Sequence, residues 1–499
     1  MKKKTLYILH FLLVASTLCV TANNIVYPWR ATTAMVERGS SFDILFDNIK
    51  FQSIDSIALI ATHHQLLMEI DSVEIGMFEF DHYTKSTVNN RIWANIPEST
   101  PEELYDLHIY CGGEVSISPK SVKVVRQFNR AHSFIHISDL HVTREWVGTA
   151  EDGYAKELEL LDSFIEVANI ISPDFILITG DNIMDYTMFD ADSTGWNGVR
   201  NYEADSRPLI EEKYKNLFYG ANGFSGIYGF NSPTFLTPGN HDFYGVSKND
   251  YFGKTLQWNR HMGKRTHGFT FAGTRVILSD DSLGDSENET PSAAIMSGLQ
   301  GKVHEQFLEE NGAGEVRILG QHKHDNIDTL FLDKHRINIL LNGHNHTPFD
   351  ELVGVTPTLN TRPGVVCRSG EVNDWEKNLG YFRIFYIDGE SYEYSEPLRF
   401  CQNPTANHND FKMNLTLDFA NDNNGKHKSN QATIENLFSV DLSKCKIRFV
   451  MEKGEYKVEG GEIYQTIEKT GYSIIDVHTD VKANNRVVVN ITPKMQEVF

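Results

Sequence analysis

The spacing of apolar residues changes twice along the chain and divides it into three parts. From residue 23 to about residue 128, short segments of alternating or β-branched apolar residues are separated by Gly, Asn, Asp and Pro, without a helical stripe. The predicted strands include Ser41–Phe46, Ser56–Ala61, Ser72–Phe78 and Tyr105–Cys111. This pattern predicts an N-terminal β-sandwich over residues 23–128, and its last hairpin looks immunoglobulin-like or fibronectin-like.

The second part, residues 129–392, combines buried strands with amphipathic helices. Residues Ala155–Ile171 have apolar side chains at helical spacing, and Pro173 follows where that helix is expected to have ended. The predicted strands are compact apolar runs, at Phe134–Ser138, Asp174–Thr179, Thr234–Thr237, Val276–Ser279, Val316–Gly320 and Ile337–Leu341. A strand, helix and strand in this order predict an α/β domain.

The third part, residues 393–499, returns to a pattern typical of β-structure. Its turns are rich in Gly and Asn, and its predicted strands are Met413–Phe419, Lys446–Met451, Ile474–Thr479 and Arg486–Ile491. We therefore expect a second β-sandwich, so that the α/β domain lies between two immunoglobulin-like or fibronectin-like domains.

The first 22 residues have the pattern of a secretory signal peptide. Three lysines precede the apolar run Leu6–Val20, and the small residue Ala22 ends the segment. The run contains His10 and is shorter than the roughly 20 residues of a membrane span, so no transmembrane helix is expected in the mature chain. Leu18 before Cys19 disfavours a lipid anchor. The prediction is export to the periplasm, the cell surface or the medium.

The composition restricts the partners. The chain of 499 residues has 46 Lys and Arg against 67 Asp and Glu, a net charge of −21, and removing three lysines with the signal peptide gives −21 − 3 = −24. Long nucleic acids are not expected partners, because they are bound mainly by a continuous cationic surface. Cys111, Cys367, Cys401 and Cys445 lack metal-binding spacing, which leaves buried thiols or one or two disulfides of open pairing.

Five short polar clusters follow the apolar strands of the middle part. Loops after the carboxyl ends of strands in an α/β sheet converge on one crevice, so these clusters are expected to meet in space. They are Asp139-Leu-His141, Gly180-Asp181-Asn182, Gly239-Asn240-His241-Asp242, His322 with His324, and Gly343-His344-Asn345-His346.

The residue types in these clusters predict a metal site. Imidazole, carboxylate and amide groups together suit divalent zinc, manganese or iron, and no Cys takes part. Two Asp, one Asn and four His make seven ligands, which fit two ions if one carboxylate is shared. Two metal ions about 3.5–4 Å apart form the arrangement that binds phosphoryl oxygens and activates a water molecule.

The ordered pattern Asp-x-His, Gly-Asp, Gly-Asn-His-Asp, His and Gly-His-x-His resembles the calcineurin-like metallophosphoesterase superfamily. The resemblance implies a sandwich of β-sheets flanked by helices and two divalent ions, Mn, Fe or Zn. It also implies two ligand sets that share Asp181: the first is Asp139, His141, Asp181 and His346, and the second is Asp181, Asn240, His322 and His344. His324 is the alternative to His322, or a substrate contact.

The resemblance also implies the catalytic residues. Metal-bound hydroxide would attack phosphorus, His241 would face the phosphate and protonate the leaving oxygen or stabilise the charge, and Asp242 would orient the His241 ring. Purple acid phosphatases are excluded, because they have Asp-x-Gly in the first block and a Tyr three residues after the Asp of the second. Here His141 ends the first block and Met184 takes the position of that Tyr.

The segment from Arg260 to His267 contains two Arg, one Lys and two further His, and we interpret it as a cationic rim for the phosphate. His267, Arg260 and His324 are the candidate substrate-binding residues, and a solvated loop is the alternative. The expected function is an exported phosphoesterase, with a phosphodiester favoured over a phosphomonoester. The alternative from another class is a surface binding or adhesion module, in which the β-sandwiches contact a surface polymer or protein and the metal domain is vestigial.

Overall fold

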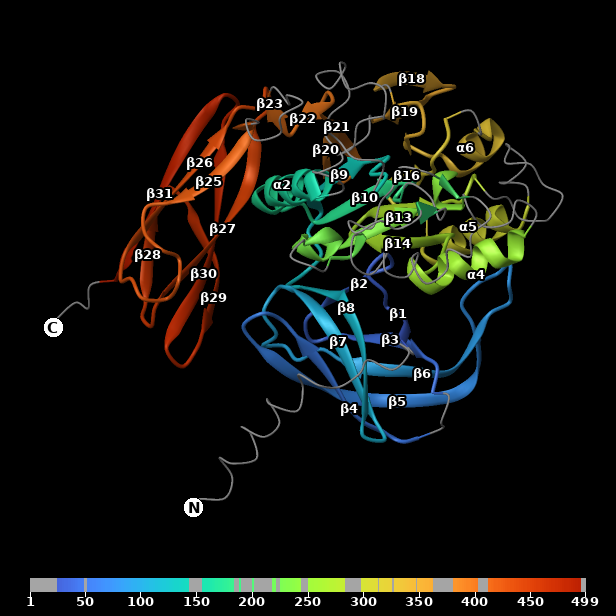
Figure 1. Ribbon diagram of the computed structural model, residues 1–499, viewed down its shortest axis with the longest axis horizontal. Helices are drawn as coiled ribbons and strands as arrows, with labels where there is room; N and C mark the ends of the chain where they lie inside the picture. The colour runs from blue at the N-terminus through green and yellow to red at the C-terminus, as the bar shows by residue number, and fades with distance from the viewer. Residues whose placement is uncertain are drawn as a thin grey trace.

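The computed structural model describes residues 25–48, 52–142, 155–183, 188–189, 200–201, 218–220, 225–243, 250–282, 298–312, 314–324, 327–346, 348–361, 380–402 and 412–494. The chain forms an N-terminal sheet domain, a middle domain with two sheets and helices, and a C-terminal β-sandwich (Figure 1). The predicted signal peptide lies outside the described residues. None of the helices in the described part is long and apolar enough to span a membrane.

The N-terminal domain is one eight-stranded sheet, ordered β1-β3-β6-β5-β4-β7-β8-β2. Ile44 and Ile92 from one half of the sheet share a core with Leu59 and Leu107 from the other half, so the sheet folds over on itself. The immunoglobulin-like or fibronectin-like identity stays a prediction. The strands are β1 Ile25–Tyr27, β2 Ala34–Glu37, β3 Ser41–Phe46, β4 Ile54–Ile60, β5 Gln65–Glu79, β6 Thr87–Asn95, β7 Leu104–Cys111 and β8 Glu114–Val125.

Two six-stranded sheets form the middle domain. The first has the order β13-β10-β9-β20-β21 with β22 beside β20, and the second has the order β14-β15-β16-β17-β19-β18. The first sheet contains β9 Ala131–Ile137, β10 Phe175–Thr179, β13 Thr234–Thr237, β20 Tyr381–Asp388, β21 Ser391–Tyr394 and β22 Leu398–Arg399. The second contains β14 His267–Phe271, β15 Thr274–Leu278, β16 Val316–Gly320, β17 Ile339–Asn342, β18 Phe349–Val353 and β19 Thr356–Asn360.

The two sheets pack face to face and bury the apolar runs of their parallel strands. Phe134 in β9 stacks between Phe175 and Phe385, with ring centroids 5.0 and 4.3 Å away, and this aromatic layer meets Ile318 and Leu341 of the second sheet. Strands β9, β10 and β13 are parallel, as are β15, β16, β17 and β19. The predicted sandwich of sheets within an α/β domain is confirmed.

Helices cover the outer faces of both sheets. Helix α2 (Ala155–Ile171) packs on the first sheet, and its bounds are those predicted from the apolar spacing. Helices α5 (Leu299–Glu310) and α6 (Thr329–His335) pack on the second sheet through Leu308, Phe331 and Leu332. Helix α4 (Tyr251–His261) lies between the middle domain and the far end of β5 and β6 (Figure 1).

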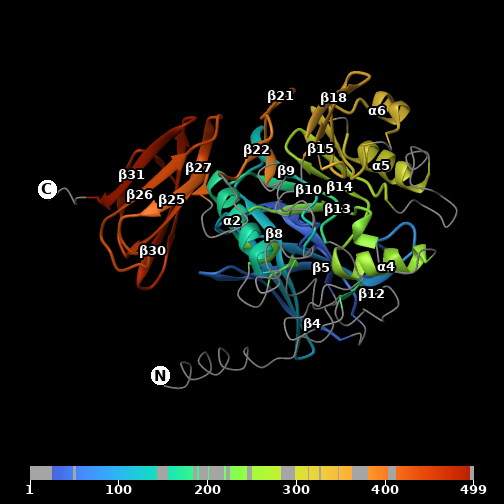
Figure 2. The same cartoon turned by 45° about the horizontal axis from the view of Figure 1, so that its top comes forward.

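The C-terminal domain is a β-sandwich of a four-stranded sheet, β25-β26-β31-β28, and a three-stranded sheet, β27-β30-β29. Helix α2 contacts β25 and β27, so the sandwich lies against the middle domain (Figure 2). Its strands are β25 Leu415–Phe419, β26 Asn430–Asn436, β27 Leu442–Glu452, β28 Tyr456–Glu459, β29 Glu462–Glu468, β30 Tyr472–Val481 and β31 Asn485–Pro493. Short strand pairs are β11 (Met188–Phe189) with β12 (Arg200–Asn201), and β23 (Cys401–Gln402) with β24 (Lys412–Met413).

Cys111, Cys401 and Cys445 are buried free thiols. Burial raises the pKa of Cys401 to about 11 and that of Cys445 to about 12, so both are neutral at physiological pH. The sequence left open buried thiols or one or two disulfides, and these three residues are buried thiols. Cys367 lies outside the described residues.

Candidate metal centre

The polar clusters predicted from the sequence lie together at the carboxyl ends of the central strands. The backbone N–H of Asp139, after β9, donates to the carbonyl of Gly180, after β10, at 3.1 Å, and that of His141 donates to the carbonyl of Asp181 at 2.8 Å. In the second sheet the N–H of Gly343, after β17, donates to the carbonyl of His322, after β16, at 2.8 Å. Backbone hydrogen bonds therefore hold neighbouring loops in fixed positions.

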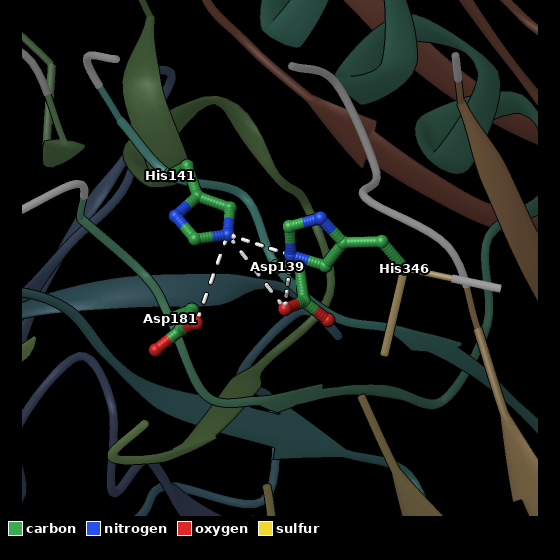
Figure 3. Close-up of side chains that lie close together, drawn as sticks. All are labelled: Asp139, His141, Asp181 and His346. Atoms are coloured by element: carbon green, nitrogen blue, oxygen red, sulfur yellow. Dashed lines mark hydrogen bonds and ion pairs between the residues drawn. The ribbon is translucent and has the colours of Figure 1, made fainter. Parts of the chain in front are cut away.

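The first group of potential ligands is Asp139, His141, Asp181 and His346, with one ligand atom of each within 4.8 Å of the others (Figure 3). Oδ1 of Asp139 lies 3.2 Å from Nε2 of His346 and 3.7 Å from Nε2 of His141. The latter nitrogen is also 3.7 Å from Oδ2 of Asp181. The four side chains point to one place from loops of both sheets.

The second group is Asp181, His322 and His344, again with ligand atoms within 4.8 Å of one another. Nε2 of His322 lies 3.1 Å from Oδ2 of Asp181. The other ring nitrogen, Nδ1, lies 2.8 Å from the carbonyl of Thr179, to which it donates a hydrogen bond. This hydrogen bond leaves Nε2 directed at Asp181. Asp181 thus belongs to both groups, as the two-metal prediction requires.

The donor atoms fit divalent metal ions. Nε2 of His141 lies 3.2 Å from Nε2 of His346, and two imidazole lone pairs this close repel unless a proton or cation lies between them. Asp139 and Asp181 are fully buried beside these rings, and a buried carboxylate is costly unless a positive charge compensates it. Imidazole and carboxylate ligands of this kind suit zinc, manganese and iron.

The attraction between buried carboxylates and imidazoles also shifts the pKa values around Asp181. Burial lowers the pKa of His322, but the charges of Asp181, Asp139 and Asp281 outweigh burial and raise it to about 10. The surrounding imidazoles, in turn, hold the pKa of Asp181 well below its usual range although burial alone would raise it. Without metal the site therefore retains a proton where a cation would bind, and metal binding would release that proton.

Five of these potential ligands have a left-handed backbone. Asp139, His141, Asp181, His344 and His346 have φ values between 46° and 71°, and they are five of the twelve non-glycine residues with positive φ in the described part of the chain. Each such conformation costs on the order of 1 kcal/mol for a residue with a Cβ atom. Backbone strain of this kind collects at functional sites, where the side-chain direction matters more than local stability.

Gly180 and Gly343 must be glycines, because potential ligands occupy the space that a Cβ atom would need at these positions. A Cβ atom on Gly180 would lie 2.6 Å from Cγ of His322, and one on Gly343 would overlap Oγ of Ser138 and Oδ2 of Asp139. Neither neighbour can move without displacing a potential ligand. This explains physically why a glycine precedes Asp181 and His344.

His241 lies at the edge of the first group, in the short helix η3 (His241–Phe243). Its backbone N–H donates to Oδ1 of Asp181 at 2.8 Å, and its ring packs edge-on against that of His141, with centroids 4.6 Å apart. Its side chain is partly exposed, as a substrate contact would be. Asn240 precedes it in the same loop and stays a predicted ligand.

The resemblance assigns Asp242 to orienting the His241 ring, and in the structure its carboxylate bonds to groups of the loops after β10 and β13. Its buried carboxylate accepts hydrogen bonds from the backbone N–H groups of Gly239 at 2.7 Å and Ile183 at 3.1 Å, and from the side-chain amide of Asn182 at 3.0 Å. Burial and the charge of Asp181 raise its pKa to about 7. Asp242 therefore connects the loop after β10 to the loop after β13.

The predicted cationic rim also requires correction. His267 is only 8% exposed, and its Nδ1 donates to the carbonyl of Lys264 at 3.1 Å. Burial and the charge of Lys264 lower its pKa to about 3, so it is a neutral, structural residue at neutral pH. Arg265 is fully buried and pairs with Asp280 at 2.8 Å. Arg260, in the last turn of α4, is exposed.

Of the two histidines in the fourth block, His322 faces Asp181 and His324 does not join either ligand group. Nε2 of His324 accepts a hydrogen bond from the side-chain amide of Asn345 at 3.0 Å, and its ring lies beside Phe349. His324 therefore lies next to the His344–His346 loop, and its role as a substrate contact stays a prediction.

The sequence interpretation missed Asp281, which lies just after β15. Its Oδ2 accepts the backbone N–H of Lys323 at 2.5 Å, and this contact fixes the loop that presents His322. Asp280 and Asp281 follow the apolar strand β15, as Asp139 follows β9. This position after a strand could have identified Asp281 from the sequence. Met184, at the position of the purple acid phosphatase tyrosine, lies outside the described residues.

Replacing Gly343 by Ala is expected to remove bound metal, because the new Cβ atom displaces Asp139. Elemental analysis of purified protein should find about two divalent ions per chain in the wild type and fewer than one in the variant. Gly471→Ala is the matched control, since nothing lies within 4 Å of its Cβ position. Equal metal content in both variants would contradict the close packing at Gly343.

The buried, neutral His267 predicts a pH effect on stability. An unfolded chain protonates this ring below pH 6.5 and the folded chain does so only near pH 3, so folded stability falls as the pH drops. By pH 5 the loss amounts to about 2 kcal/mol. His267→Gln should abolish this part of the acid sensitivity in urea unfolding at pH 8 and pH 5, whereas His427→Gln, in a C-terminal turn, should not. Identical pH profiles for wild type and His267→Gln would refute the assignment.

Comparison with known proteins agrees with the ligand pattern. Residues 132–348 match the family model of the calcineurin-like phosphoesterases. No curated protein sequence matches the chain. Among solved structures, PhoD gives a TM-score of 0.43 at 10% identity, covering 84% of this chain and 92% of its own. The purple acid phosphatase PPD1 from yellow lupin (Lupinus luteus) seeds gives 0.38 at 10% identity, covering 71% and 69%. Residues 132–348 therefore form a domain that belongs to the calcineurin-like phosphoesterase family.

Proposed function

We propose that the chain is an exported phosphoesterase that uses two divalent metal ions and hydrolyses a phosphodiester. The observation that carries this proposal is the carboxylate of Asp181, which lies in both groups of ligands. A carboxylate shared between two metal ions is what an enzyme needs to hold two ions close enough to act on one phosphoryl group.

Under this proposal Asp139, His141, Asp181 and His346 hold one ion, and Asp181, Asn240, His322 and His344 hold the other. The ions are Mn, Fe or Zn, and once bound they supply positive charge for the phosphoryl oxygens and lower the pKa of water. The chain itself fixes the ligand positions through the hydrogen bonds from His322 to Thr179 and from His344 to Asp139.

His241 is proposed to donate a proton to the leaving oxygen. Its backbone bond to Asp181 and its edge contact with His141 hold the ring beside the first ligand group. Because the side chain is partly exposed, it can contact a substrate that enters from solvent. Asp242 supports this position indirectly, since it holds the loop on which His241 lies.

We favour a diester over a monoester because two residues of the predicted cationic rim, Arg265 and His267, carry no free positive charge. A diester brings one negative charge and a monoester brings two, so a monoester needs more cations beside the metals. Arg265 is already neutralised by Asp280, and His267 is buried and uncharged, so neither supplies that extra charge. Phosphomonoesterase activity is the second candidate, because both reactions use the same pair of ions.

Asp181→Asn and His241→Ala are expected to lower kcat at least 100-fold on an activated aryl phosphodiester, because the first removes the shared ligand and the second removes a side chain that faces the phosphate and stabilises its charge. Hydrolysis of bis(p-nitrophenyl) phosphate and p-nitrophenyl phosphate is compared, with manganese, zinc or iron added. The diester should give the higher kcat/KM. Asp422→Asn, on an exposed turn of the C-terminal sandwich, is the control that keeps full activity.

Activity that survives both substitutions would reject the assigned site. A chain that binds no metal and hydrolyses neither ester would instead support the alternative of a surface binding module. A higher kcat/KM for the monoester would replace the proposed substrate class and leave the metal ligands in place.

Export forms part of the proposal and rests on the charged and apolar pattern of residues 1–22. Expression in a secreting bacterial host should give a mature chain that begins at Asn23, which intact-mass measurement detects as the loss of 22 residues. Ala22→Arg, which places a large charged residue at the cleavage site, should block this processing. A wild-type chain that keeps Met1 would reject the signal peptide.

A further inference from the structure

A cavity of about 560 Å³ is lined by residues of all three parts of the chain, including residues of helix α2. Its walls come from Lys120 and Lys123 in the N-terminal domain, Ile170 in α2, and Leu417 and Arg448 in the C-terminal sandwich. This volume is in the range of small-molecule binding sites. The described residues that line it include none of the metal ligands.

A β-bulge fixes Lys120 at the wall of this cavity. The pairing of β7 with β8 shifts between Tyr105 and Leu107, and Lys120 has a φ of 49°. Its N–H donates to Oδ1 of Asp106 at 2.8 Å, and its carbonyl accepts a hydrogen bond from Arg30 at 3.2 Å. Bulges of this kind change the direction of one side chain, and here the bulged residue is a cation that lines the cavity.

The ammonium groups of Lys120 and Lys123 form no hydrogen bond or ion pair with any other described residue, although both side chains are partly buried. Their cationic neighbours in the same wall are compensated. Nζ of Lys446 lies 3.2 Å from Asp476, and Arg448 pairs with both Asp476 and Glu103. Asp106 and Glu103 lie within electrostatic range of Lys120, and Glu102 and Asp174 within range of Lys123, but neither ammonium group has a direct ion pair among the described residues. Each ammonium group can therefore pair with an anion that enters the cavity.

Apolar side chains form the facing wall. Met413, Leu417 and Phe419 are only partly buried, and they pack beside the fully apolar core that includes Leu415. Three acidic residues also line the cavity: Glu166 and Asp418 are exposed, and the buried Glu103 pairs with Arg448. The lining therefore combines partly buried lysines with an apolar surface.

We propose that this cavity binds a small organic anion, whose acidic group contacts Lys120 and Lys123 and whose apolar part contacts Leu417 and Phe419. Carboxylate, phosphate and sulfonate groups share the chemistry that two ammonium groups recognise. The site is separate from the metal centre and does not depend on the proposed phosphoesterase activity.

Isothermal titration calorimetry with 1-naphthalenesulfonate on the full mature chain tests this proposal. The sulfonate has no phosphate ester to hydrolyse, and one site per chain is expected. The double substitution Lys120→Gln and Lys123→Gln should weaken binding at least tenfold. The double substitution Lys453→Gln and Lys457→Gln, at exposed positions of the C-terminal sandwich, is the charge-matched control and should leave the affinity unchanged.

Two further variants test whether the probe occupies this cavity or the metal centre. Thr416→Trp reduces the cavity without touching the lysines and should also abolish binding, while Asp181→Asn should leave it intact. Unchanged affinity in the lysine double variant, with its circular dichroism spectrum intact, would overturn the proposal. So would loss of binding in Asp181→Asn, which would place the probe at the metal centre, or equal affinity for the uncharged 1-naphthalenemethanol.

Discussion

The buried carboxylate of Asp181 is the group on which the rest of the site depends. One of its oxygens accepts the backbone N–H of His241, and the other faces the rings of His141 and His322. A carboxylate that is almost fully buried is stable only if the surrounding groups compensate its charge. The loops after β10, β13 and β16 are therefore arranged around a single negative charge.

Two other carboxylates hold the same loops in place through the backbone. Asp139 accepts the N–H of His344, which connects the loop after β9 to the loop after β17 across the two sheets. Asp242 accepts N–H groups from Gly239 and Ile183. These hydrogen bonds compensate the left-handed conformations of the ligands, since each loop is fixed at more than one point. The strands below them, whose buried residues are mostly apolar, form the base on which these loops are fixed.

The sequence predicted the parts of this structure that depend on neighbouring residues. The bounds of α2, β13 and β16 agree with the structure, because a buried helix and buried parallel strands have continuous local patterns. The ligand groups were predicted because each cluster follows a strand directly. The contacts of Asp242 and Arg265 could not be predicted from local sequence, since their partners, Ile183 and Asp280, lie 59 and 15 residues away along the chain. The contact of Asp281 with Lys323 was missed in the same way, because the two residues are 42 positions apart.

Helix α2 explains why the three parts of the chain depend on one another. Nearly all of its apolar residues are buried, since one face packs on the first sheet and another on the C-terminal sandwich. A helix that is apolar on both faces requires both neighbours to be stable. The N-terminal domain completes this arrangement, because Glu103 pairs with Arg448 and the backbone of Glu102 bonds to Gln465. Strand β10 begins four residues after α2 ends, and Asp181 follows it, so a short segment connects the helix that contacts the sandwich to a potential metal ligand.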